Sequence, residues 1–164
     1  MKTKNNKTKK SISVWLVLND KKKKEVFVLQ KRSSNEKFSP FICQPTWAGK
    51  VEKNETIEDA IKRECQEELG DNFKKNFNFS SLSFISSETY SLKGENRESF
   101  NYLGEITKKQ LLLAKIHKDA ENNFVFTDKN CEIFSLKSKK NPKENIVLFN
   151  DQYKVLKNLI NAPR

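Results

Sequence analysis

The sequence predicts one α/β domain, a sandwich in which helices pack on a β-sheet. Three observations predict this fold class. The 164 residues suit a single domain with a sizeable core. Several short runs are rich in β-branched and aromatic residues, which is typical of strands. Two other segments carry apolar residues at helical spacing, and strands mixed with helices favour a layered fold.

The N-terminal part predicts two strands after a basic tail. Residues 1–10, "MKTKNNKTKK", are polar and basic, so we expect a disordered tail there. "SISVWLVL" at 11–18 and "EVFVLQKR" at 25–32 predict two strands, separated by the polar turn "NDKKKK". No later segment is typical of a linker, so we expect residues 11–164 to form a single domain.

A helix is predicted next, at about 56–69. Thr56 suits its N-cap, Glu58 and Asp59 fall in its first turn, and Gly70 suits its termination. We expect the segment just before it, "WAGKVEKNE", to lead into the helix.

The C-terminal half predicts further strands and a closing helix. "SSLSFISSETYSL" and "ESFNYLGEIT" predict two strands around the turn "KGENR", and "NFVFTDKNCEIFSL" predicts one or two more. The segment at about 150–161 has apolar residues at helical spacing and predicts an amphipathic helix with Asn150 as its cap.

The composition limits which cell compartment and which binding partners we expect. The formal net charge is +11, but the lysines cluster with asparagines in runs typical of solvated tails and loop tips, so they indicate RNA binding only weakly. Cys43, Cys65 and Cys131 are odd in number, widely spaced and without a CxxC pair, which favours reduced thiols and a cytoplasmic protein. We expect no membrane segment, because no apolar run is long enough to span a bilayer.

Acidic residues gather in one part of this basic chain. From Glu52 to Asp71 there are eight acidic and three basic residues, a net charge of −5, so the remainder carries +16. Within the predicted helix, an apolar stripe is formed by Ile57, Ala60 and Ile61. Seven residues after each of them come Glu64, Glu67 and Glu68, which therefore continue a stripe that ought to face the protein.

Three interpretations of the acidic stripe stay open on spacing alone. A solvated charged face explains most glutamate-rich helices, although here the acids follow the core stripe. A partly buried ion-pair network with basic residues is the second. The third is a divalent metal site, because closely grouped hard oxygen ligands on one helix suit Mg²⁺ or Mn²⁺.

A longer segment resembles the signature of a known family. Residues 49–70 read Gly, five residues, Glu, seven residues, Arg-Glu, two residues, Glu-Glu, one residue, Gly. The matching positions are Gly49, Glu55, Arg63, Glu64, Glu67, Glu68 and Gly70. This pattern is similar to the Nudix box of MutT-like hydrolases. The resemblance implies an α/β/α sandwich with a mixed sheet, and hydrolysis of a nucleoside diphosphate linked to another moiety.

Three positions depart from the usual box. Cys65 and Asp71 stand where aliphatic residues are common, and we expect Asp71 to mark an early exit of the chain. Ala48 stands where a second glycine is common, but an alanine keeps the backbone carbonyl that the resemblance implies as a metal ligand.

The resemblance also implies roles for single residues. Glu64, Glu67 and Glu68 would hold Mg²⁺, or Mn²⁺ in its place, with the Ala48 carbonyl and Glu52 as further ligands. Arg63 would orient Glu67, and Glu55 would hold the loop and helix together. Either Glu64 or Glu67 would take the proton from water, with Glu121 and Glu132 as downstream candidates. Lys50 and Gly49 would meet the substrate, and Trp47 would either pack the loop or form a wall of the substrate site.

Two alternative functions are compatible with the same fold. "LQKRSSNEKFSPFICQPTWAG" is also similar to the segment before the box in isopentenyl-diphosphate isomerase, where Cys43 would lie near the right loop. The isomerase needs a histidine-rich metal site, however, and His117 is the chain's single histidine. A non-catalytic or RNA 5′-end-directed binding protein of the same fold is the other reading. The resemblance leaves a homodimer open.

Overall fold

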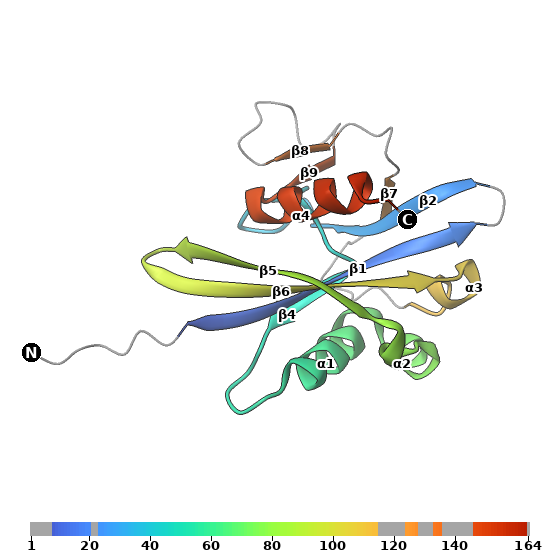
Figure 1. Ribbon diagram of the computed structural model, residues 1–164, viewed down its shortest axis with the longest axis horizontal. Helices are drawn as coiled ribbons and strands as arrows, with labels where there is room; N and C mark the ends of the chain where they lie inside the picture. The colour runs from blue at the N-terminus through green and yellow to red at the C-terminus, as the bar shows by residue number, and fades with distance from the viewer. Residues whose placement is uncertain (1–7, 21–22, 115–123, 128–132, 136–145, 164) are drawn as a thin grey trace, which may run out of the picture.

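The computed structural model describes residues 8–20, 23–114, 124–127, 133–135 and 146–163. A β-sheet lies between two layers of helix (Figure 1). Helices α1 (Ile57–Leu69) and α2 (Asp71–Asn76) lie on one face, and α4 (Asn150–Asn161) lies on the other. This arrangement confirms the predicted α/β/α sandwich. Across the described residues, no helix has the length and apolarity needed to span a membrane.

The sheet is mixed, as predicted. Its strands are β1 (Lys9–Asp20), β2 (Lys23–Lys31), β3 (Cys43–Gln44), β4 (Trp47–Lys50), β5 (Ser83–Leu92), β6 (Glu95–Ile106), β7 (Phe124–Thr127), β8 (Ile133–Ser135) and β9 (Ile146–Leu148). The order is β5-β6-β1-β2-β3-β9-β8, with β4 also paired to β1 and β7 to β2. β1 runs parallel to β6 and antiparallel to β2.

Strand β1 has two different neighbours along one edge. Its first half, from Ser11 to Val14, pairs with β4, and its second half, from Leu16 onward, pairs with β2. β4 and β2 therefore diverge near Trp15. Helix α1 packs on β4 beside this opening, so the split determines which part of the sheet the end of α1 meets.

The run "VWLV" in β1 (residues 14–17) is apolar without alternation because both faces of the sheet are covered. Alternate residues point to opposite layers. Val14 and Leu16 join the core under α1 and α2, whereas Trp15 and Val17 join the core under α4. Both cores are needed to enclose this strand.

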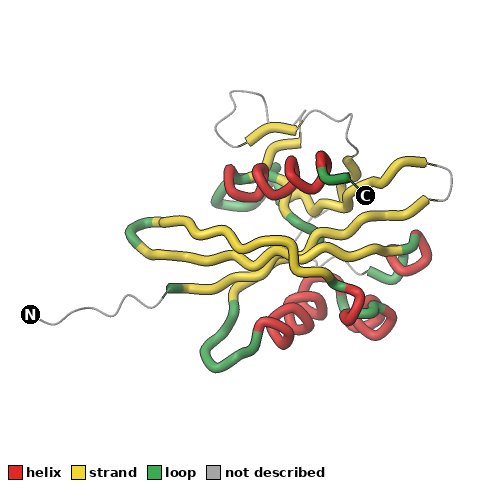
Figure 2. Tube along the Cα trace, viewed as in Figure 1, coloured by secondary structure: helices red, strands yellow, loops and turns green. Residues whose placement is uncertain are grey.

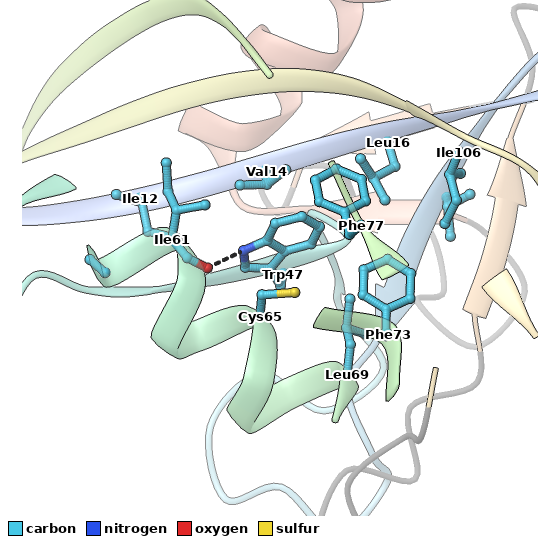
Figure 3. Close-up of a cluster of buried hydrophobic side chains, with 12 residues drawn as sticks. Ile12, Val14, Leu16, Trp47, Ile61, Cys65, Leu69, Phe73, Phe77 and Ile106 are labelled. Carbon is cyan, nitrogen blue, oxygen red and sulfur yellow. Dashed lines mark hydrogen bonds between the residues drawn. The ribbon is translucent and has the colours of Figure 1, made fainter. Parts of the chain in front are cut away.

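Trp47 is the centre of the core under α1 (Figure 3). Its side chain is fully buried, and its Nε1–H donates to the carbonyl of Ile61 at 3.1 Å. The rings of Phe73 and Phe77 meet it edge-on, with centroids 6.2 and 5.5 Å away. This location matches the packing role for Trp47, because a side chain enclosed in the core cannot form the wall of a substrate site.

Several boundaries differ from the sequence-based predictions. Lys9 and Lys10 lie in β1 and not in the tail, because β1 pairs with β6 from Lys9 onward. Trp47 begins strand β4, where a loop was expected. The short elements β3, β9, α2 and α3 (Lys108–Leu111) were not predicted, since segments this short carry too little periodicity to be recognised.

Two predicted helix features are wrong. Asp71 does not mark an early exit of the chain, because a second helix starts there. Gly70 turns it at φ 85°, Asp71 starts α2 in the first turn, where the helix dipole favours an acid, and Phe73 anchors that helix in the core. Asn150 is not the cap of α4, since Phe149 occupies the N-cap position without a side-chain bond.

Replacing Phe73 by alanine should lower the free energy of unfolding by about 3–5 kcal/mol, because a buried aromatic side chain is removed from a closed core. Phe38 is the matched control. It is 75% exposed, so Phe38→Ala should change the free energy by no more than about 0.5 kcal/mol. Urea unfolding followed by tryptophan fluorescence measures both. Equal losses in the two variants would contradict the described core.

Candidate active site

Helix α1 begins and ends where the sequence predicts. The Thr56 hydroxyl accepts the backbone N–H of Asp59 at 3.1 Å, and Gly70 ends the helix. Ala60 and Ile61 are buried, so the apolar stripe faces the core as expected. The next turns of that face carry Glu64 and, four residues later, Glu68.

One guanidinium joins this helix to the loop before it (residues 51–56), which Figure 2 shows between β4 and α1. Arg63 donates from Nε and Nη2 to the two carboxylate oxygens of Glu55, at 2.8 and 3.0 Å. Its Nη2 also donates to the Lys50 carbonyl at 2.7 Å. Its Nη1 donates to Glu64 at 2.7 Å and to Glu67 at 3.2 Å. We call Arg63 with Glu55, Glu64 and Glu67 the arginine cluster.

Glu55 fastens the loop to the arginine. Besides Arg63, its carboxylate accepts the backbone N–H of Glu52 at 2.8 Å. These bonds, first those from Arg63, lower the pKa of Glu55. Glu55 in turn contributes most to raising the pKa of Arg63. A charge-assisted pair therefore fixes the loop ahead of α1.

Glu64 lies directly over Gly49. A Cβ at position 49 would overlap the Glu64 carboxylate, so the glycine is required by the close approach of an acid and not by an unusual φ. Only 12% of the Glu64 side chain is exposed, and this burial raises its pKa in spite of the bond from Arg63.

Glu68 is held from the opposite side, by β2 and β4. Its carboxylate accepts Gln30 Nε2 at 3.0 Å and the backbone N–H of Ala48. Burial, together with the negative charge of Glu64, raises the pKa of Glu68 to about 8. A largely buried carboxylate beside a second one is an unfavourable arrangement that a bound cation would relieve.

Glu67 differs from its two neighbours because its side chain is 57% exposed. Two of the three glutamates thus turn toward the protein and the third reaches toward solvent from the same end of α1. Within the described ranges, no three acidic, histidine or cysteine side chains converge as a ready metal cage.

The remaining predicted residues lie in different places. Lys50 and Glu52 are exposed on the β4–α1 loop and its approach, beside the arginine cluster. Glu121, Glu132, His117 and Cys131 fall outside the described residues. Cys43 is 1% exposed, and burial raises its pKa to about 11.

Two residues at the site were not predicted from the sequence. Thr46, fully buried, occupies the opening between β4 and β2, where its hydroxyl accepts the N–H of Leu16 at 2.9 Å and donates to the carbonyl of Val28 at 2.7 Å. Gln30 donates to the carbonyl of Thr46 as well as to Glu68. The sequence held one signal for Gln30, which directly follows the apolar run "VFVL". A polar residue in that position can be a buried hydrogen-bond partner.

Arg63→Lys should lower the free energy of unfolding by about 1–3 kcal/mol, because one ammonium cannot replace a planar fork that bonds several oxygens. Arg32→Lys is the control, since Arg32 pairs with one half-exposed carboxylate, that of Glu36. This substitution should lower the free energy of unfolding by less than about 1 kcal/mol. Chemical denaturation at pH 7 measures both. A larger loss in Arg32→Lys would contradict the central role of Arg63.

Comparisons with known proteins agree with this geometry. The family model described as NUDIX domain matches residues 7–126. No curated protein matches the chain. Among solved structures, a NUDIX hydrolase from Alicyclobacillus acidocaldarius is 13% identical, with a TM-score of 0.63 over 96% of this chain and 93% of the other.

Two further structures share the fold. A MutT/nudix family protein from Enterococcus faecalis is 16% identical, with a TM-score of 0.61 over 92% of this chain and 60% of its own. An Ap4A hydrolase from C. elegans is 16% identical, with a TM-score of 0.51 over 75% of this chain and 82% of its own. The structures show a common fold, and the family match spans most of the chain: the protein belongs to the Nudix family of hydrolases.

Proposed function

We propose that the protein hydrolyses a diphosphate bond in a nucleoside diphosphate linked to another moiety, with Mg²⁺ or Mn²⁺. The observation that carries this proposal is the arginine cluster beside Glu68 at the end of α1. Three carboxylates gather there within two helical turns, and two of them are turned toward the fold. The ion pairs of Arg63 account for Glu55, Glu64 and Glu67 as a structural network. Among the described residues they do not reach Glu68, so such a network leaves this buried acid unexplained.

The residues present fit a divalent cation. Glu64, Glu67 and Glu68 supply hard oxygen atoms, which Mg²⁺ prefers, and the close pair Glu64 and Glu68 carries charge that its protein partners only partly offset. We propose these three glutamates as the ligands, with the Ala48 carbonyl and Glu52 as further candidates. The cation would neutralise phosphate oxygens and lower the pKa of a bound water.

The other predicted site residues would hold the acidic side chains and the substrate in position. Arg63 would keep Glu67 and Glu64 oriented through its 3.2 and 2.7 Å bonds, while Glu55 would keep Arg63 in place. Water would attack phosphorus, one P–O bridge would break, and Glu67 or Glu64 would take the proton. Gly49, whose missing Cβ makes room for the Glu64 carboxylate, would meet the substrate beside that acid, and Lys50 would supply a positive charge next to it.

The location of Cys43 argues against the isomerase alternative. A catalytic cysteine has to reach its substrate, whereas this thiol is enclosed and its pKa is raised. RNA binding as the main role has no support beyond the net charge. The buried free thiols of Cys43 and Cys65 fit the cytoplasmic location that we propose for this enzyme.

Cys43 should resist alkylation in the folded protein. At pH 8, below its pKa of about 11, iodoacetamide should leave the Cys43 peptide unmodified, and urea should make it reactive. Peptide mapping by mass spectrometry measures this directly. The hydrolase activity of Cys43→Ala should stay within about threefold of wild type, provided that the variant folds. Rapid labelling of the native protein would reopen the isomerase reading.

The activity itself is tested with a panel of nucleoside diphosphate derivatives in the presence of Mg²⁺ or Mn²⁺. We expect turnover that EDTA abolishes and added Mg²⁺ restores. Glu67→Gln should lower kcat by about 100-fold or more, because a metal ligand or a proton acceptor is lost, while leaving the melting temperature nearly unchanged, since the side chain is exposed.

Glu58→Gln is the matched control for this experiment. Glu58 is an exposed acid in the first turn of the same helix, so its removal changes the charge equally without touching the cluster, and kcat should stay within about twofold. Turnover of no compound on the panel, or equal kcat in Glu67→Gln and wild type, would overturn the proposed function.

A further inference from the structure

Gln30 is a buried polar residue that lies outside the Nudix box and bonds one of the acids inside it. It belongs to β2, and only 5% of its surface is exposed. Its Nε2 donates to Glu68 Oε2 at 3.0 Å and also to the carbonyl of Thr46. The residues of the box give Glu68 a role but do not account for this amide.

The amide of Gln30 has one orientation that suits its neighbours. An amide NH2 group carries two hydrogen atoms, and the Thr46 carbonyl and Glu68 Oε2 offer one acceptor for each. With nitrogen and oxygen exchanged, the amide carbonyl would be directed at two other oxygen atoms and would be repelled by both. The Thr46 carbonyl therefore decides that Gln30 presents a donor to Glu68.

Thr46 is in turn held by the split in the sheet. Leu16 of β1 stands opposite Val28 of β2, and the Thr46 hydroxyl bonds both of them. It accepts the Leu16 N–H at 2.9 Å and donates to the Val28 carbonyl at 2.7 Å. A fully buried hydroxyl that both donates and accepts has a defined position. Strands β1 and β2 thus locate Thr46, and Thr46 locates Gln30.

The Glu68 carboxylate is bonded from two strands by neutral donors. Besides Gln30 of β2, the backbone N–H of Ala48 in β4 donates to it. The other two acids at this end of α1 are bonded by the Arg63 guanidinium, whose ion pairs among the described residues do not extend to Glu68. Glu68 is therefore oriented by groups that leave its negative charge in place.

An acid held in this way is suited to bind a cation. A ligand that is already oriented loses less conformational freedom when the ion arrives. Hydrogen bonds to metal ligands fix their orientation, and removing such a bond typically weakens metal binding by about 10–100-fold. The bonds to Glu68 come from strands that the sheet splits apart, so the sheet and not α1 alone sets the direction of this carboxylate.

We propose that Gln30 is a positioning residue for the cation, acting through Glu68, and that Thr46 holds Gln30 for this purpose. The inference rests on the proposed function and adds to it two residues outside the box. It makes cation affinity depend on the place where β4 and β2 diverge. A purely structural Gln30 would instead stabilise the fold equally with and without the cation.

The test measures the affinity of the full chain for Mn²⁺ by EPR titration without substrate. Gln30→Met keeps the length of the side chain and removes both N–H donors. Kd for Mn²⁺ should rise about tenfold or more, because Glu68 loses a bond that orients it. Gln66→Met is the matched control. Gln66 is exposed on the same helix as Glu68, so this change should alter Kd by less than about twofold.

A second substitution shows whether the effect passes through Glu68. In a Glu68→Gln protein, adding Gln30→Met should raise Kd by less than about twofold, because the carboxylate that Gln30 orients is already gone. A further tenfold rise in the double variant would overturn the inference, since Gln30 would then act on the cation by another route.

A thermal shift separates positioning from a purely structural role. Mn²⁺ stabilises the folded protein to an extent that depends on Kd, so its addition should raise the melting temperature less in Gln30→Met than in wild type or Gln66→Met. Equal shifts together with equal Kd would overturn the inference, even if Gln30→Met melts at a lower temperature. Gln30→Asn, whose amide is one methylene further back, takes its place in every measurement if Gln30→Met does not fold.

Failure of the inference and failure of the proposed function give different results. Mn²⁺ binding by the wild type that the Gln30 variant leaves unchanged overturns the inference alone. No Mn²⁺ binding by the wild type overturns the cation assignment on which both rest. Weakened Mn²⁺ binding in the Gln30 variant supports the inference even if no compound on the panel is hydrolysed.

Discussion

The arrangement of the site depends on one guanidinium. Arg63 bonds Glu55 with two nitrogen atoms and also reaches the Lys50 carbonyl, Glu64 and Glu67. It thereby sets the loop before α1 and the acids on α1 in a fixed relation. Without this single cation, the carboxylates would repel one another, and the loop before α1 would lose its attachment to the helix. Positioning and charge balance are supplied by the same side chain.

The core under α1 offsets the cost of the acids. Glu64 and Glu68 have raised pKa values because they are partly withdrawn from water, which disfavours their charged forms. The same helix buries Cys65 and Leu69 one position after each of them, against Trp47 and the phenylalanines of the core. Apolar burial on one strip of α1 therefore stabilises a helix that presents acids on the adjoining strip. Tension of this kind between stability and function is common at active sites.

The acidic and basic residues of the chain lie in different parts of the fold. The segment from Glu52 to Asp71 carries a net charge of −5 in a protein of +11. Five basic residues, by contrast, line a cavity between the start of β1, the β4–α1 loop and the outer parts of β5 and β6: Lys9, Lys10, Lys50, Lys53 and Arg97. The acids of α1 and most of these bases therefore lie on different elements, which the β4–α1 loop joins.

The sequence by itself determined α1, its cap at Thr56, its end at Gly70 and the stripe that turns Glu64 and Glu68 inward, because capping and periodicity act over a few residues. It also indicated most strands and the family. Only the tertiary structure decided that Trp47 is core, that Cys43 is enclosed, that Gln30 holds Glu68 and that Arg97 stands beside Lys9. The last two pairs are 38 and 88 residues apart, and no local pattern encodes which distant strands become neighbours. The split of β1 between β4 and β2 brings Gln30 of β2 and Ala48 of β4 to one carboxylate, that of Glu68, and the pairing of β1 with β6 brings Arg97 to Lys9.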